Sequence, residues 1–212
     1  MSNNPEFELA ELVGRYAMDP LGFAMMAFPW GTDPRYSLVK LKEPWATRYD
    51  SEYGPDEWTC RMLDDVAEGI RERNFDGTNA VDPIRVAVAS GHGIGKSFTT
   101  GLLLWWLLSC HPFCKGTVTA NTMGQLETKT WAQFASMKEA CITGHWFDIT
   151  MAKNSMKAYH KDYKESWFVS AQTSKEENSE AFAGQHAANS TSFYIFDEAS
   201  GIPDKIWEVA EG

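Results

Sequence analysis

Apolar residues recur every three or four positions in two stretches near the start of the chain. The first stretch covers residues 6–18 and the second covers residues 56–74, and this spacing predicts an amphipathic helix in each. Residues 19–32 are also apolar and aromatic, but Pro and Gly interrupt them. We expect residues 1–80 to form a helical N-terminal arm, joined to the remainder by a turn-rich linker at residues 76–83.

Beyond this linker the pattern changes to short apolar runs that are rich in β-branched and aromatic residues. These runs predict strands at residues 84–89, 116–120, 167–171 and 193–196. Residues 97–110 are apolar on nearly all sides, as in a buried helix, and Thr122 begins a capping box that predicts a further helix. Strands that alternate with helices favour an α/β fold with a mostly parallel sheet flanked by helices.

Composition and charge narrow the class of protein. The 212 residues are 43% hydrophobic, which is enough for the core of one α/β domain with a leading arm. The net charge of -10 argues against a chain that coats nucleic acid, but it does not prevent a small basic patch from gripping DNA. The four cysteines form only one CxxxC pair, so we expect reduced thiols rather than a zinc site. The longest apolar run, residues 101–110, is shorter than the roughly 20 residues that a membrane span needs.

A glycine-rich loop, SGHGIGKS at residues 90–97, lies between a predicted strand and a predicted helix. This is the setting of a phosphate-binding P-loop, in which glycines let backbone N–H groups converge on phosphate oxygens. In that interpretation Lys96 reaches the β- and γ-phosphates and the Ser97 hydroxyl holds Mg²⁺. The strict pattern has Gly at the position of Ser90, and the alternative is a glycine-rich turn with an incidental lysine. The residues expected to contact ATP are Ser90, Gly91, His92, Gly93, Ile94, Gly95, Lys96, Ser97 and Phe98.

The last predicted strand ends on two neighbouring carboxylates, Asp197 and Glu198. Ligands of open α/β sheets bind at the carboxyl ends of the strands, so we expect these residues and the loop to share one edge. Asp197 would hold Mg²⁺ together with Ser97, while Glu198 would act as the general base or orient the attacking water. Glu198 and Lys96 are therefore catalytic candidates. The alternative is a solvated acidic pair that simply ends a strand.

Beyond these motifs, the chain resembles the large terminase subunits of phages and prophages. The segments that carry the resemblance are spread over most of the chain: DPLGFAMMAFPWG (19–31), VAVASGHGIGKS (86–97), VTANTMGQLETKTW (118–131), GHWF (144–147), SEAFAGQH (179–186) and FDEASGIPDKIWEVAEG (196–212). The last four of these segments are not shared by P-loop enzymes at large. The resemblance implies a RecA-like P-loop ATPase that uses ATP and Mg²⁺ to drive double-stranded viral DNA into a procapsid.

The same resemblance implies partners and a wider architecture. The expected partners are double-stranded DNA, a portal protein and a small terminase subunit. The subunits are expected to form a homo-oligomeric ring on the portal, whereas an isolated chain stays monomeric. The expected location is the host cytoplasm, without a membrane. Residues 81–212 would form the ATPase core, and we expect the coupling motif and an RNase H-like nuclease domain to follow it.

Two positions depart from the pattern of that family. Thr59 lies in the adenine-side segment, where a Gln commonly follows Trp58, and a Thr there puts adenine selection by that side chain in question. His92 occupies the position where an Arg usually precedes the lysine by four residues. Either His92 is protonated against the γ-phosphate and acts as a third catalytic residue, or it is a loop residue and a neighbouring subunit supplies the charge.

Other interpretations stay open at this point. A helicase-like P-loop ATPase would also carry the sequence DEAS at residues 197–200, and a regulatory or scaffold module would bind a nucleotide without hydrolysing it. Glu198 argues against the second interpretation, because binding alone needs no second carboxylate. Residues 177–184 either line the nucleotide or DNA face or form a solvated loop. Candidates for a further DNA or phosphate contact are Thr119, Asn121 and Thr122.

Overall fold

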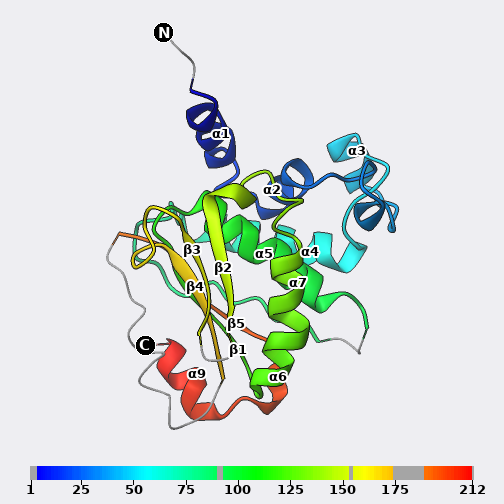
Figure 1. Cartoon of the computed structure of the whole chain (residues 1–212). Coiled ribbons are helices and arrows are strands. Elements are labelled where there is room, and N and C mark those ends of the chain that lie inside the picture. Colours follow the sequence, from blue (N-terminus) through cyan, green and yellow to red (C-terminus); the bar gives the residue numbers. More distant parts are fainter. Residues whose placement is uncertain (1–3, 90–92, 153–154, 174–188, 212) are drawn as a thin grey trace.

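A computed structural model describes residues 4–89, 93–152, 155–173 and 189–211 of the chain. Five strands form one sheet in the order β2–β3–β4–β1–β5, and helices pack against it (Figure 1). The strands are β1 (Lys115–Ala120), β2 (Phe147–Ala152), β3 (Ser155–His160), β4 (Phe168–Thr173) and β5 (Ser192–Phe196). The chain therefore has the expected α/β fold.

The sheet is mixed rather than mostly parallel. β1 pairs in parallel with β4 on one side and with β5 on the other, whereas β3 pairs antiparallel with both β2 and β4. The sequence predicted the three strands of the parallel part, β1, β4 and β5. It did not predict the β2–β3 hairpin, although these strands alternate polar and apolar residues, as half-buried antiparallel strands commonly do.

The strand predicted at residues 84–89 is wrong. These residues pair with no strand in the described part of the chain, and Val86 and Val88 are exposed. Ile84 is better covered, since its side chain packs on α4 at Gly69, where an added Cβ would come within 2.7 Å of it. A β-branched run becomes a strand only where a neighbouring strand completes its backbone hydrogen bonds, and none of the described strands does so here.

The N-terminal arm is helical, as expected. Its helices are α1 (Pro5–Gly14), α2 (Pro20–Ala27), the 3-10 turn η1 (Pro34–Tyr36), α3 (Trp45–Tyr49) and α4 (Glu57–Glu72). α1 and α4 confirm the two predicted amphipathic helices. α2 was not predicted, because Pro and Gly ordinarily interrupt helices. Here Pro20 occupies the first turn, where its missing N–H costs nothing, and Asp19 caps the helix by accepting a hydrogen bond from the amide of Gly22 at 2.8 Å.

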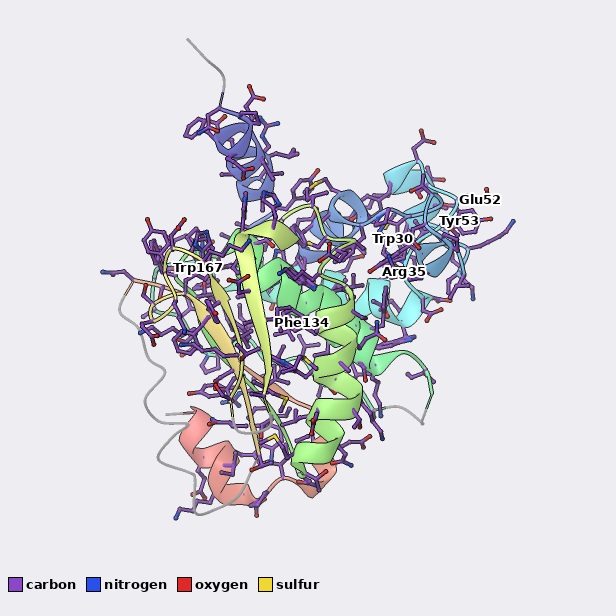
Figure 2. The ribbon with its side chains drawn as sticks, in the orientation of Figure 1. Trp30, Arg35, Glu52, Tyr53, Phe134 and Trp167 are labelled. Atoms are coloured by element: carbon purple, nitrogen blue, oxygen red, sulfur yellow. The ribbon has the colours of Figure 1, made fainter. Side chains whose placement is uncertain are left out.

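One hydrophobic core joins the arm, the helices and the sheet around α5 (Lys96–Cys110), which is buried on nearly all sides as predicted. Trp105 donates from its indole to the carbonyl of Phe134 at 3.1 Å, which links α5 to α7 (Trp131–Ser136). Phe134 is labelled in Figure 2. Trp106 donates to the carbonyl of Tyr16 at 2.8 Å and so fastens the arm to α5. From the sheet side, Trp167 donates to the carbonyl of Leu108 at 3.0 Å (Figure 2).

The remaining short elements lie around the carboxyl ends of β1 and β5 and before β2. They are α6 (Met123–Gln125), the π-helical turn η2 (Leu126–Thr130), η3 (Gly144–Trp146), η5 (Ala199–Gly201) and α9 (Asp204–Glu211). Thr122 caps α6 by accepting from the amide of Gln125 at 3.3 Å, which confirms the start of the predicted helix. Within the described ranges, no helix combines the length and the apolar character that crossing a membrane requires. The four cysteines are buried free thiols.

His111 follows α5 directly and is buried, with 3% of its surface exposed. The hydroxyl of Thr191 lies 3.1 Å from the carbonyl oxygen of Gly77 and 2.8 Å from Nδ1 of His111, within hydrogen-bond distance of both. The imidazole also stacks on Phe75, with ring centroids 6.3 Å apart. Burial lowers the pKa of His111 to about 4, so the ring is neutral in the folded protein near pH 7.

This buried histidine makes the stability of the chain depend on pH. Below its ordinary pKa of 6.5, His111 takes up a proton in the unfolded chain but not in the folded chain. We expect its contribution to lower the free energy of unfolding by about 2 kcal/mol between pH 7 and pH 5. Urea unfolding of the parent and of His111→Gln at both pH values isolates this contribution, because the other groups titrate in both proteins. If the free energy of unfolding fell equally in the two proteins between pH 7 and pH 5, the lowered pKa of His111 would be contradicted.

Candidate functional site

The glycine-rich loop leads directly into α5. The part of it that lies outside the described residues comprises Ser90, Gly91 and His92. Gly93 and Gly95 have φ angles of 78° and 86°, in the left-handed region that suits glycine. Gly95 is also the N-cap of α5 and has no side chain to bond the first amides of the helix. Amides in the first turn have no partner within their own helix, and this arrangement attracts anions.

The start of α5 and the end of β5 meet at Lys96 and Glu198. Lys96 Nζ lies 4.0 Å from Glu198 Oε1, and both side chains are partly exposed, at 29% and 27%. Glu198 has a φ of 53°, a left-handed conformation that is uncommon for a residue with a side chain. The structure thus brings together the two catalytic candidates that lie within its described part, from segments far apart in the sequence.

Hydrogen bonds hold Asp197 on both its backbone and its side chain. Its amide donates to the carbonyl of Thr119 in β1 at 2.8 Å. Its Oδ1 accepts from the amide of Glu198 at 3.0 Å, and its Oδ2 accepts from the hydroxyl of Thr130 in η2. No residue pattern around Thr130 pointed to this contact, because the inward direction of its side chain depends on a π-helical turn.

The other loop residues within the described part have different surroundings. The carbonyl of Ile94 accepts a hydrogen bond from the indole of Trp58 at 3.1 Å. The ring of Phe98 packs with Trp30 and Tyr36, at centroid distances of 6.1 and 5.9 Å, so its side chain belongs to the core. Ser97 is partly buried in the first turn of α5. Its role as a Mg²⁺ ligand stays a prediction.

The start of α4 is fastened to the loop and to α5. Besides the bond from Trp58, the hydroxyl of Thr59 lies 2.7 Å from that of Thr99 in α5. Both threonines are buried, with 2% of their surface exposed. Thr59 therefore ties two helices together, and its hydroxyl lies in the interior rather than on an exposed surface.

An open cavity of about 390 Å³ lies beside this tie. Within it, Glu57 bonds Arg61 at 2.6 Å and Lys42 at 3.1 Å. These hydrogen bonds, from Arg61 first and then Lys42, hold the pKa of Glu57 below its usual value. The residues that line the cavity are Val39, Lys40, Lys42, Asp56, Glu57, Trp58 and Arg61.

The three candidate residues at the end of β1 and just after it divide into buried and exposed positions. Thr119 is fully buried, which excludes it as a DNA contact. Asn121 is exposed and lies against η5, where it leaves no room for a Cβ at Gly201. Thr122 is exposed and caps α6. Residues 177–184 lie outside the described residues, and in the described ranges no three His, Cys, Asp or Glu side chains gather in a metal-binding cluster.

Comparison with known proteins gives one informative similarity. The chain is 27% identical over 185 residues to a probable large terminase subunit of Enterobacteria phage P7. The aligned region covers 85% of this chain but only 35% of that relative, so the chain spans about a third of its length. No protein-family model and no solved structure matches the chain. The similarity supports a relationship to the terminase large subunits, in agreement with the motifs.

Replacing Thr59 with Val keeps the shape of the side chain and removes the hydroxyl that pairs with Thr99. Thr99 keeps a second partner, the carbonyl of Gly95 at 3.3 Å, so we expect the free energy of unfolding to fall by only about 1 kcal/mol. Urea unfolding measures this loss, and Thr47→Val at an exposed position is the control, with an expected change below about 0.5 kcal/mol. If Thr59 instead contacted the base of a bound nucleotide, Thr59→Val would lose nucleotide affinity and keep the parental free energy of unfolding.

Proposed function

We propose that this chain is the ATPase part of a terminase-type packaging motor, a RecA-like P-loop ATPase that drives double-stranded viral DNA into a procapsid. The similarity to a probable large terminase subunit supports the motor, together with the motifs outside the loop. The observation that carries the ATPase proposal is the approach of Lys96 to within 4.0 Å of Glu198. This pair joins a cation suited to phosphate with a carboxylate suited to act on water.

The described part of the loop leaves open space beside its glycines, which supports the proposal of a phosphate site. An added Cβ at Gly93 would meet nothing within 4 Å, and the nearest atom to one at Gly95 would be Asp56 Oδ2 at 3.7 Å, so the loop is open on its outer side. The amides of the first turn of α5 and the ammonium of Lys96 would together hold the phosphate oxygens. Bound Mg²⁺ would neutralise part of the phosphate charge, and Ser97 and Asp197 are the residues that would hold it.

Lys96 and Glu198 have linked roles in this proposal. A partly exposed ion pair contributes little to stability, so Lys96 can exchange Glu198 for phosphate oxygens at small cost. Its charge-assisted hydrogen bonds to those oxygens are the stronger ones. Glu198, released from Lys96, would then orient the attacking water and accept its proton. The exchange would couple nucleotide binding to activation of the carboxylate.

The proposal extends to the partners of a packaging motor. These are double-stranded DNA, a portal protein and a small terminase subunit, with the motor subunits in a homo-oligomeric ring on the portal. The positive charge that stabilises the transition state would come either from His92 or from a neighbouring subunit of that ring.

Lys96→Ala tests nucleotide binding. The substitution removes a charge-assisted contact to the β- and γ-phosphates, so we expect at least about tenfold weaker binding of Mg-ATP. Calorimetric titration measures the affinity, and Lys205→Ala, which removes the same charge from an exposed position in α9, is the matched control. If the parent and Lys96→Ala bound Mg-ATP with equal affinity, the assignment of residues 90–97 as a P-loop would be contradicted.

Glu198→Gln tests the chemistry separately from binding. The amide keeps the size of the side chain but cannot accept a proton from water. We expect near-normal ATP affinity and a loss of turnover of about a hundredfold or more. Steady-state ATPase rates of the full-length motor on its portal give the result, with Glu208→Gln in α9 as the control. A variant that hydrolyses ATP at the parental rate would show that Glu198 is not the catalytic carboxylate.

A further inference from the structure

Thr130 connects the helical layer to the acidic end of β5. It is the last residue of η2 (Leu126–Thr130), between α6 and α7, and it is fully buried. Its hydroxyl donates to Oδ2 of Asp197, while Oδ1 accepts from the amide of Glu198 at 3.0 Å. Both carboxylate oxygens of Asp197 are therefore held by the protein, one of them from a segment distant in the sequence.

The π-helical turn accounts for the direction of Thr130. The amide of Trp131 bonds back to the carbonyl of Leu126, five residues earlier, which is the widened spacing of a π-helix. Leu126 and Thr130 are the two buried residues of the turn. The indole of Trp131 then donates to the carbonyl of Thr150 in β2 at 3.0 Å and anchors the turn on the sheet. Single π-helical turns within helices are uncommon and occur frequently at functional sites.

The chemistry of the two donors suits a cation site. One donor is a hydroxyl and the other a backbone amide, so neither neutralises the charge of Asp197. Together these two hydrogen bonds restrict rotation of the Asp197 carboxylate about its Cβ–Cγ bond. Residues that orient a metal-binding carboxylate through hydrogen bonds commonly change the metal affinity by about 10- to 100-fold when they are mutated.

We propose that Thr130 is the positioning residue for Mg²⁺ at Asp197, and this inference rests on the ATPase proposed above. The hydroxyl of Thr130 holds the carboxylate in the orientation that binds the cation. Each oxygen of Asp197 accepts one hydrogen bond and keeps a second lone pair, with which the carboxylate would hold the cation or its water. Thr130 itself touches neither the nucleotide nor the cation, and the turn η2 sets its place.

The experiment measures ATP binding by calorimetry in the full-length protein over a range of Mg²⁺ concentrations and also with EDTA. Thr130→Val keeps the shape and removes the hydroxyl, so we expect half-maximal binding to need about tenfold more Mg²⁺. Binding without Mg²⁺ should be unchanged, and Thr130→Ser should restore the parental Mg²⁺ dependence to within about twofold. Thr128→Val is the matched control, because its hydroxyl donates within the same helical segment, to the carbonyl of Gly124 at 2.6 Å.

Asp197→Asn separates the failure of this inference from the failure of the proposed function. If Asp197→Asn leaves the Mg²⁺ dependence unchanged, Asp197 does not hold Mg²⁺ and the proposed metal site fails. If Asp197→Asn shifts the dependence and Thr130→Val does not, the role of Thr130 is overturned. Should Thr130→Val not fold, Thr130→Cys has a similar size and a weaker donor. A shift of about threefold in that variant would support the inference, and an unchanged Mg²⁺ dependence would overturn it.

Discussion

The enclosure of α5 is the constraint on which the other parts of the structure depend. Tryptophan and leucine side chains occupy nearly all sides of this helix, so no face of it can be left in water. The arm, α7 and the sheet cover it, and each supplies or receives a tryptophan hydrogen bond, at Tyr16, Phe134 and Trp167. Because α5 begins at Lys96, the packing that encloses the helix also determines where the loop presents its lysine.

The candidate site is assembled between layers rather than within one of them. The helix supplies Lys96, the end of β5 supplies Asp197 and Glu198, and the π-helical turn supplies Thr130. Each layer is held to α5 or to β1 by its own hydrogen bonds and apolar contacts. A shift of one layer against another would therefore alter the separation of Lys96 and Glu198 or the hydrogen bond to Asp197. The geometry of the candidate site is sensitive to packing for that reason.

Two hydrogen bonds from the start of α4 show how the residue at a motif position, here Thr59, can take a structural role. Trp58 reaches the carbonyl of Ile94 in the loop, and the next residue, Thr59, turns inward to Thr99. A short hydroxyl can fill that interior position, whereas a long amide would have to point elsewhere. The cavity next to the loop is instead lined mainly by exposed charged side chains, several of which pair with one another.

Local patterns in the sequence determined the helices α1, α4 and α5, the three parallel strands, and the identity of Lys96, Asp197 and Glu198 as the residues with suitable chemistry. Such features depend on neighbours within a few positions, so periodicity and residue type predict them. Only the tertiary structure decided that residues 84–89 stay outside the sheet, that the β2–β3 hairpin extends it, and that Thr130 bonds Asp197. Strand pairing and the partners of buried hydroxyls depend on groups far away in the sequence, which no local pattern encodes.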